Sequence, residues 1–131
     1  MGLGEIALRV ADLDAMQRFY AEVLGLELIR RFPNSAFFRI APGIAGHTQI
    51  LALFDRGESD SPTPEHSPLD HLAFAIGQDD YEPEKTRLEG LGLAVTTAYH
   101  EWVKWRSLYI RDPEGNTVEL VCYDPEFSDS P

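Results

Sequence analysis

Two matching segments of this sequence begin with residues that can bind a metal ion. GEIALRV, residues 4–10, has Glu5 near its start, and DHLAFAI, residues 70–76, has His71 in the same place. A third candidate is Glu119 in NTVELV, because a carboxylate within an apolar strand is costly to bury unless it is paired or coordinated. Carboxylate oxygens and imidazole nitrogens both coordinate divalent cations, so metal binding is the first chemistry to consider.

Each of these residues also has an interpretation without a metal. Glu5 at the start of a strand would then face water or Arg9, and His71 would be a structural histidine. Glu119 would form a salt bridge with an arginine. The elements around the three residues decide which interpretation the chain favours.

Those elements form an internal repeat. Each half of the chain shows a period-two strand, an amphipathic helix and three further strands, which is a βαβββ unit. The expected helices cover residues 13–24 and 81–89, and the later strands cover 27–32, 36–40, 48–54, 94–99, 107–111 and 117–123. Asp12 and either Asp79 or Asp80 are the expected N-caps, and Gly25 is expected to end the first helix.

The repeat predicts an α+β fold in which two tandem βαβββ modules form a cup-shaped mixed sheet within one domain of 131 residues. The modules would span about residues 3–56 and 69–123, joined by an acidic linker at 57–68 that is rich in Pro and Ser. Residues 124–131 are expected to form a flexible tail. One module alone leaves a sheet face uncovered, so two modules must pack together around a shared concavity.

Charge and cysteine content exclude some partners. The formal net charge is −11, and a field of that sign repels nucleic acid and anionic lipid surfaces, so neither is an expected partner. The acid excess serves solubility, or it selects a cationic ligand. No apolar run approaches the ~18 residues of a membrane span. The single cysteine, Cys122, cannot form an internal disulfide, which fits a cytoplasmic protein. It lies on the apolar side of its strand, where no nucleophile is expected.

Four segments carry a resemblance to a known family. They are EIALRVADL (5–13), FYAEVLGLEL (19–28), DHLAFAI (70–76) and RSLYIRDPEGNTVELV (106–121). On these segments the sequence resembles the vicinal oxygen chelate superfamily, which includes glyoxalase I, extradiol dioxygenases, fosfomycin-resistance thiol transferases and bleomycin-resistance proteins. The resemblance covers roughly residues 3–123 and implies a glyoxalase/dioxygenase-like fold.

The resemblance also implies a pseudo-symmetric site for one divalent ion, which would be Zn, Ni, Mn, Co or Fe(II). Carried onto this chain, its ligands are Glu5, His71 and Glu119, although the family usually has histidine in place of Glu5. Aligning TQILALFD on TVELVCYD puts Ile50 opposite Glu119, and a shift of one residue offers Gln49 instead. The missing second carboxylate counts against an ordinary glyoxalase I, and the ligand set is not the two-His, one-carboxylate set of iron dioxygenases.

Candidates for substrate binding come from the resemblance at one position, Arg9, and from a dense group of aromatic residues near residues 99–109. Arg9 stands in an LRV context where relatives hold a substrate carboxylate, or it is an exposed strand arginine. An aromatic group would line the mouth of the cavity, with His100 or Tyr109 as an acid or base beside Trp102 and Trp105. Core or dimer packing is an equal explanation for that group.

The expected function is a metal-dependent enzyme acting on a small oxygen-chelating substrate, of the lyase/isomerase type or the extradiol dioxygenase type. Glu119 or Glu5 would leave the ion briefly and move a proton. The alternative is a bleomycin-resistance-like protein that sequesters a small cationic ligand without metal, which Trp102, Trp105 and the acid excess favour. A homodimer is expected in either case.

Overall fold

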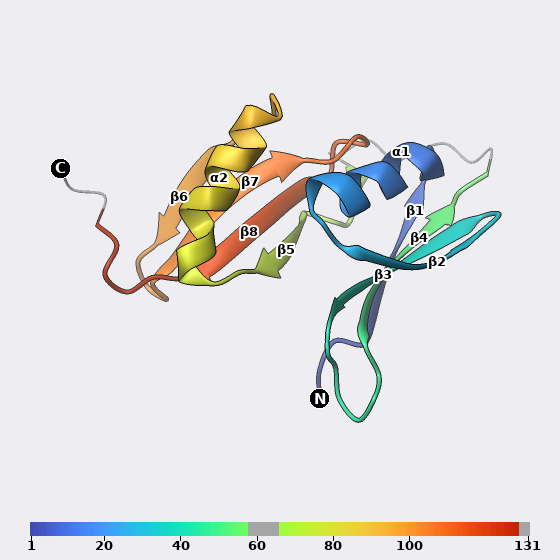
Figure 1. The fold of residues 1–131 in the computed structure, drawn as a ribbon, viewed down its shortest axis with the longest axis horizontal. Coiled ribbons are helices and arrows are strands. Elements are labelled where there is room, and N and C mark those ends of the chain that lie inside the picture. The colour runs from blue at the N-terminus through green and yellow to red at the C-terminus, as the bar shows by residue number, and fades with distance from the viewer. Residues whose placement is uncertain (58–65, 129–131) are drawn as a thin grey trace. The chain divides into compact units, whose positions relative to one another are not determined.

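The chain folds into two compact units in the computed structural model, Met1–Thr63 and Pro64–Pro131. The structure describes residues 1–57 and 66–128, so most of the expected linker at 57–68 lies outside the described residues. Each unit contains one four-stranded mixed sheet and its helices, which confirms the α+β class (Figure 1). Within the described ranges, no helix is long and apolar enough to cross a membrane.

The first unit has the predicted order of elements. They are β1 (Glu5–Val10), α1 (Leu13–Arg18), the π-helix η1 (Phe19–Val23), β2 (Glu27–Phe32), β3 (Ser35–Ala41) and β4 (Gln49–Asp55). The sheet order is β1-β4-β3-β2, with β1 parallel to β4. Asp12 caps α1 as predicted, because its Oδ1 accepts a hydrogen bond from the Ala15 amide at 3.0 Å.

The first helix differs from the single helix predicted over residues 13–24. From Phe19 to Val23 it widens into a π-helix, in which both Phe19 and Tyr20 are buried. The wider turn lets these consecutive aromatic side chains enter the core, where their rings pack edge to face at 5.1 Å. Gly25 then stops the helix with a φ of +76°, a conformation that glycine adopts without steric cost.

The second unit repeats this order. Its elements are β5 (His71–Ala75), the 3-10 helix η3 (Gln78–Asp80), α2 (Tyr81–Gly90), β6 (Thr96–His100), β7 (Trp105–Arg111) and β8 (Thr117–Tyr123). The sheet order is β5-β8-β7-β6, with β5 parallel to β8. Asp80 precedes α2, but its side chain makes no capping hydrogen bond with the helix, because η3 supplies the preceding turn instead.

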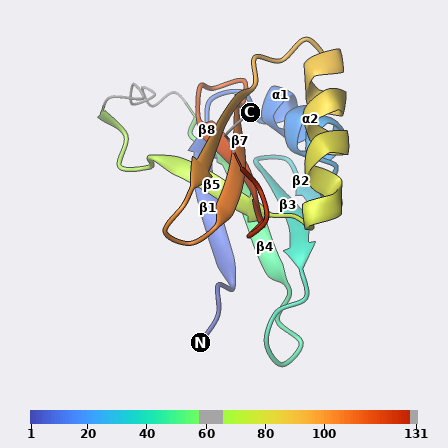
Figure 2. The same cartoon turned by 90° about the vertical axis from the view of Figure 1, so that its left-hand side faces the viewer.

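Alternation along the strands gives each sheet two different faces. One face carries the apolar side chains that pack with the unit's own helix, and these are almost fully buried. They include Val10, Phe38, Leu51 and Leu53 in the first unit, and Leu72, Leu108, Ile110, Val118, Leu120 and Cys122 in the second. The other face of each sheet, called here the helix-free face, carries the alternate residues. Figures 1 and 2 both show α2 lying along one side of the second sheet.

The start of the predicted flexible tail packs on the second unit. The Asp124 amide donates to the Lys104 carbonyl at 2.9 Å, and the Asp124 carbonyl accepts from the Tyr99 hydroxyl at 3.1 Å. Phe127 adds a ring contact with Tyr99 at 5.1 Å. Hydrogen bonds and aromatic packing therefore order residues 124–127, while 129–131 lie outside the described residues.

Candidate metal centre

The helix-free face of the second sheet places most of the predicted site residues together. Ladder pairing across β5, β8, β7 and β6 arranges its side chains in four rows, since residues of the same parity share a face. The rows are His71–Thr117–Arg111, Ala73–Glu119–Tyr109–Thr96, Ala75–Val121–Ser107–Ala98 and Tyr123–Trp105–His100. The alanines keep the space around the polar side chains open.

His71 and Glu119 form the centre of this face. His71 Nε2 lies 3.2 Å from Glu119 Oε1, and the Glu119 residue is only 6 % exposed. The two residues stand in neighbouring rows on adjacent strands, so the ladder itself determines that their side chains meet. The structure therefore brings together the two predicted ligands that lie in this unit.

Two further side chains orient the pair. Ser107 Oγ donates a hydrogen bond to Glu119 Oε2 at 2.5 Å, and Ser107 is fully buried. Its carbonyl accepts a hydrogen bond from the buried Tyr81 hydroxyl at 2.8 Å, which ties this position to α2. On the other side, His71 Nδ1 lies 2.7 Å from Asp70 Oδ2. Carboxylate partners of this kind fix the tautomer and ring orientation of metal-binding histidines.

The partner of Nδ1 determines what Nε2 can do. A carboxylate only accepts hydrogen bonds, so Nδ1 carries the proton of a neutral His71 and Nε2 presents a lone pair toward Glu119. A lone pair and a carboxylate oxygen at 3.2 Å require a positive group between them, either a proton or a metal ion.

The pair fits a divalent ion as two adjacent ligands. Ligand bonds of about 2.0–2.2 Å would join two atoms 3.2 Å apart at an angle of about 100°, close to tetrahedral or octahedral geometry. Over residues 1–57 and 66–128, no group of three or more His, Cys, Asp or Glu side chains is arranged to hold a metal ion. A complete site therefore needs ligands besides His71 and Glu119.

Tyr109 and His100 form a second polar pair on the same face. His100 Nε2 lies 3.1 Å from the Tyr109 hydroxyl, across the small Ala98. Burial raises the pKa of Tyr109 above its usual range, the hydrogen bond with Ser107 lowers it, and the Glu119 carboxylate raises it further. The phenol is consequently protonated at neutral pH and can donate a hydrogen bond or a proton beside Glu119.

Comparisons with known proteins show the family to which the chain belongs. Residues 2–120 match the family described as the Glyoxalase/Bleomycin resistance protein/Dioxygenase superfamily. The chain belongs to this superfamily. It is 31% identical over 118 residues to the glutathione transferase FosA of Serratia marcescens, covering 90% of this chain and 78% of that protein.

Solved structures from the same superfamily share the fold. A lactoylglutathione lyase from Agrobacterium tumefaciens is 34% identical with a TM-score of 0.66, covering 92% of each chain. A glyoxalase/dioxygenase from Nostoc punctiforme is 28% identical with a TM-score of 0.75, covering 94% of this chain and 91% of that one. These matches confirm the predicted resemblance and the glyoxalase/dioxygenase-like fold.

Two of the residues predicted from the superfamily lie in the first unit. Glu5 begins β1 opposite Ile50, and Arg9 lies on the same face opposite Phe54; both are exposed. Arg9 lines a shallow hollow of about 490 Å³ beside Phe54. Their roles as metal ligand and substrate-binding arginine stay predictions.

The ladder corrects the alignment of the fourth position. Ala7 pairs with Ala52 as Ala73 pairs with Glu119, so Ala52, rather than Ile50 or Gln49, is the counterpart of Glu119. Strand alternation could not separate Ile50 from Ala52, because the two residues have the same parity. Neither side chain is a metal ligand, so the absence of a carboxylate at this position stands.

The predicted tryptophans lie at or beyond the end of the face farthest from His71, whereas Tyr109 lies beside Glu119. Trp102 and Trp105 have ring centroids 6.3 Å apart, and Trp102 is 84% exposed. Tyr123 pairs with Trp105 in the ladder and is also exposed. The tryptophans therefore form an accessible aromatic surface rather than core, and their role in substrate binding stays a prediction.

Sequence reasoning missed the two residues that orient the pair, Ser107 and Asp70. Ser107 precedes Tyr109 by two residues in one strand, and this shared parity was the available signal. Asp70 directly precedes His71, but adjacency alone does not show that a side chain turns back onto its neighbour. Cys122 is buried as predicted, and burial raises the pKa of its thiol, with Asp124 adding to the effect.

Proposed function

We propose that this chain is a metal-dependent enzyme whose reaction involves a glutathione-type thiol. Its substrate is either a small molecule that such a thiol attacks or an adduct that already contains the thiol. The observation that carries the proposal is the contact between His71 Nε2 and Glu119 Oε1 at 3.2 Å, each oriented by a further hydrogen bond. Glu5 is the proposed third ligand. The metal-dependent class is supported by membership of the superfamily and by the curated relatives.

A divalent ion at this site would supply Lewis-acid polarisation of neighbouring substrate oxygens. The chain's own residues would do the remaining work. Ser107 holds one oxygen of Glu119, so the other oxygen keeps a constant direction toward His71. Tyr109, protonated at neutral pH, would donate a proton or hydrogen bond to a substrate oxygen, and His100 at 3.1 Å would exchange that proton with solvent.

The substrate class rests on two named relatives. A glutathione transferase and a lactoylglutathione lyase are each more than 30% identical to this chain, and both names refer to glutathione. A third relative, at 25% identity over 122 residues, is the metallothiol transferase FosB of Bacillus licheniformis. These names favour thiol transfer or thioester formation over ring cleavage by a dioxygenase.

The experiment is a pair of thiol assays with glutathione and each of Zn²⁺, Ni²⁺, Mn²⁺ and Fe²⁺. One assay adds fosfomycin and follows loss of the free thiol; the other adds a 2-oxoaldehyde and follows thioester absorbance. We expect turnover in one assay that needs added metal and is lost in Glu119→Gln. Loss of thiol that is equal for wild type and Glu119→Gln would contradict the proposal.

A second candidate function is metal-free sequestration of a small cationic aromatic ligand. The specific observation in its favour is the exposed pair Trp102 and Trp105, in a chain with a net charge of −11. A pure binding protein has no need for a His71–Glu119 pair held by two outer hydrogen bonds. Tryptophan fluorescence quenching by a cationic aromatic dye, retained in His71→Ala, would favour sequestration.

A further inference from the structure

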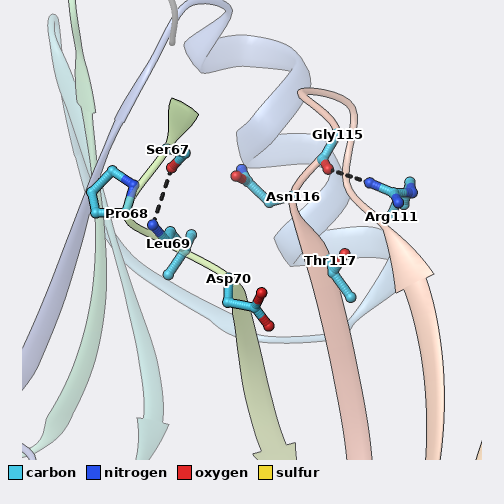
Figure 3. A pocket seen from close by; sticks show the side chains of 8 residues that line it. All are labelled: Ser67, Pro68, Leu69, Asp70, Arg111, Gly115, Asn116 and Thr117. Carbon is cyan, nitrogen blue, oxygen red and sulfur yellow. Dashed lines mark hydrogen bonds between the residues drawn. The ribbon is translucent and has the colours of Figure 1, made fainter. Parts of the chain in front are cut away.

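A polar hollow lies beside the candidate metal centre, at the end of the second sheet where β5 and β8 begin. Its volume is about 490 Å³, and its lining includes Ser67, Asp70, Arg111, Asn116 and Thr117. Figure 3 shows the segment of Ser67 and Asp70 on one side of it and the β7–β8 hairpin on the other. All of these residues belong to the second unit.

The hollow is connected to the metal centre through one row of the ladder. His71 pairs with Thr117, and Thr117 pairs with Arg111 on the next strand. With strands about 4.8 Å apart, the backbones of His71 and Arg111 are about 10 Å apart, which is within reach of one small substrate. Asp70 stands between the two sites, and its carboxylate is already engaged by His71 Nδ1 at 2.7 Å.

Arg111 is the residue that gives the hollow its chemistry. Its Nη1 donates to the Gly115 carbonyl at 2.8 Å, which holds the guanidinium against the β7–β8 turn (Figure 3). Among residues 1–57 and 66–128, no carboxylate forms an ion pair with it. The guanidinium keeps further N–H donors in a planar fork, which matches an oxyanion.

The neighbouring groups complete the donor set. Ser67 Oγ accepts from the Leu69 amide at 3.1 Å, so its own proton remains available to donate. Thr117 supplies a second hydroxyl. Asn116 Nδ2 donates to Asp112 Oδ2 at 2.8 Å, and Asp112 also accepts from the Asn116 amide, so the turn that carries Arg111 and Asn116 is rigid.

We infer that this hollow is a subsite for an oxyanion, a carboxylate or a phosphate-like group, at the far end of the substrate. Arg111 is its principal donor, and the hydroxyls of Ser67 and Thr117 assist. The inference deepens the proposed function and rests on it in one respect, namely that the same substrate also reaches His71 and Glu119. It predicts a substrate whose anionic group is separated from its reacting oxygens by several bonds.

The test uses the full chain freed of metal with a chelator, so that anions cannot bind an ion at His71. Inorganic phosphate and acetate are titrated separately at constant ionic strength, and the amide resonances of Gly115 and Asn116 are followed by NMR. We expect saturable shifts in the wild type, and the stronger of the two anions identifies the group preferred. Arg111→Gln should weaken binding about tenfold, because it removes a charge-assisted fork.

Three variants make the result specific. Arg18→Gln removes the same charge from the last turn of α1 and should leave binding unchanged. Arg111→Lys keeps the charge but loses the planar fork, so it should bind more weakly than wild type. Thr117→Val changes little volume and should also weaken binding. It provides the test of the subsite if Arg111→Gln does not fold.

Two outcomes overturn the inference. One is the absence of saturable shifts in the wild type. The other is a lowered melting temperature in Arg111→Gln with unchanged anion binding, because Arg111 would then only brace the Gly115 turn. Metal uptake by the wild type separates the two proposals: a wild-type protein that binds phosphate through Arg111 but takes up no divalent ion refutes the proposed function and leaves the subsite standing.

Discussion

The most informative single change in the site is Ser107→Ala. The hydroxyl of Ser107 is fully buried and donates to Glu119 Oε2 at 2.5 Å, while the backbone of Ser107 is held separately by Tyr81. Alanine therefore removes the side-chain hydrogen bond and leaves the strand and its link to α2 unchanged. The carboxylate, only 6 % exposed, cannot replace the lost partner easily with water.

The structure sets the size of the effect. A hydrogen bond to a charged group contributes about 1.5–3 kcal/mol, so Ser107→Ala should lower the free energy of unfolding of the metal-free protein by about that amount. Loss of an outer-shell partner also weakens metal binding, by about 10–100-fold. Both effects act through Glu119. In a Glu119→Gln background the cost of Ser107→Ala should therefore fall below about 1 kcal/mol.

Urea denaturation measures the first effect, and calorimetric titration with Zn²⁺ or Mn²⁺ measures the second. Ser35 provides the matched control, because it is the counterpart of Ser107 in the first unit. Ser35 pairs with Phe54 as Ser107 pairs with Val121. The first unit has Ala52 at the position of Glu119, so Ser35 has no carboxylate to orient there. Ser35→Ala should leave metal affinity unchanged. A Ser107→Ala protein with wild-type stability and metal affinity within about twofold of wild type would refute the reasoning.

Three further predictions follow from contacts in the second unit and from the expected assembly. Burial raises the pKa of Tyr81 and Tyr109, so the folded state retains their protons more strongly than the unfolded state. The free energy of unfolding should therefore be full below pH ~10 and fall as the pH rises above it, which urea denaturation measures. The fall should be smaller in Tyr81→Phe. Arg106 lies 4.0 Å from the ring of Tyr81 and 4.2 Å from that of Phe127, so Arg106→Met should cost about 1–2 kcal/mol of unfolding free energy, and an unchanged denaturation midpoint would contradict this. Light scattering should give twice the 14.7 kDa of one chain, whereas a monomer mass would exclude the expected homodimer.

Strand positions and faces were predictable because they depend on local pattern. Period-two alternation puts Glu119 on the opposite face of its strand from Leu120, and the ladder confirms it: Glu119 pairs with Ala73 and Tyr109, whereas Leu120 pairs with Phe74 and Leu108. The repeat then identified His71 as the start of the matching strand. The resemblance to the superfamily then implied that His71 and Glu119 belong to one site.

Register and local helix geometry were not predictable in the same way. Ile50 and Ala52 have the same parity, so alternation does not show which of them is the counterpart of Glu119; only the β1–β4 ladder, which pairs Ala7 with Ala52, decides it. The counterpart of Glu119 was therefore assigned two residues too early. The π-helix at Phe19 arises from packing of consecutive aromatic side chains, and a helical period in the sequence does not distinguish it from α-helix.

Metal content of the purified chain tests the central claim most directly. The wild type, His71→Ala, Glu119→Gln and Glu5→Gln proteins are incubated with Zn²⁺, Ni²⁺, Mn²⁺ or Fe²⁺, desalted and analysed for bound metal. We expect about one ion per wild-type chain, loss of that ion in His71→Ala and Glu119→Gln, and weaker retention in Glu5→Gln. A wild-type protein that retains none of these ions, or retains them equally in all four proteins, would contradict it.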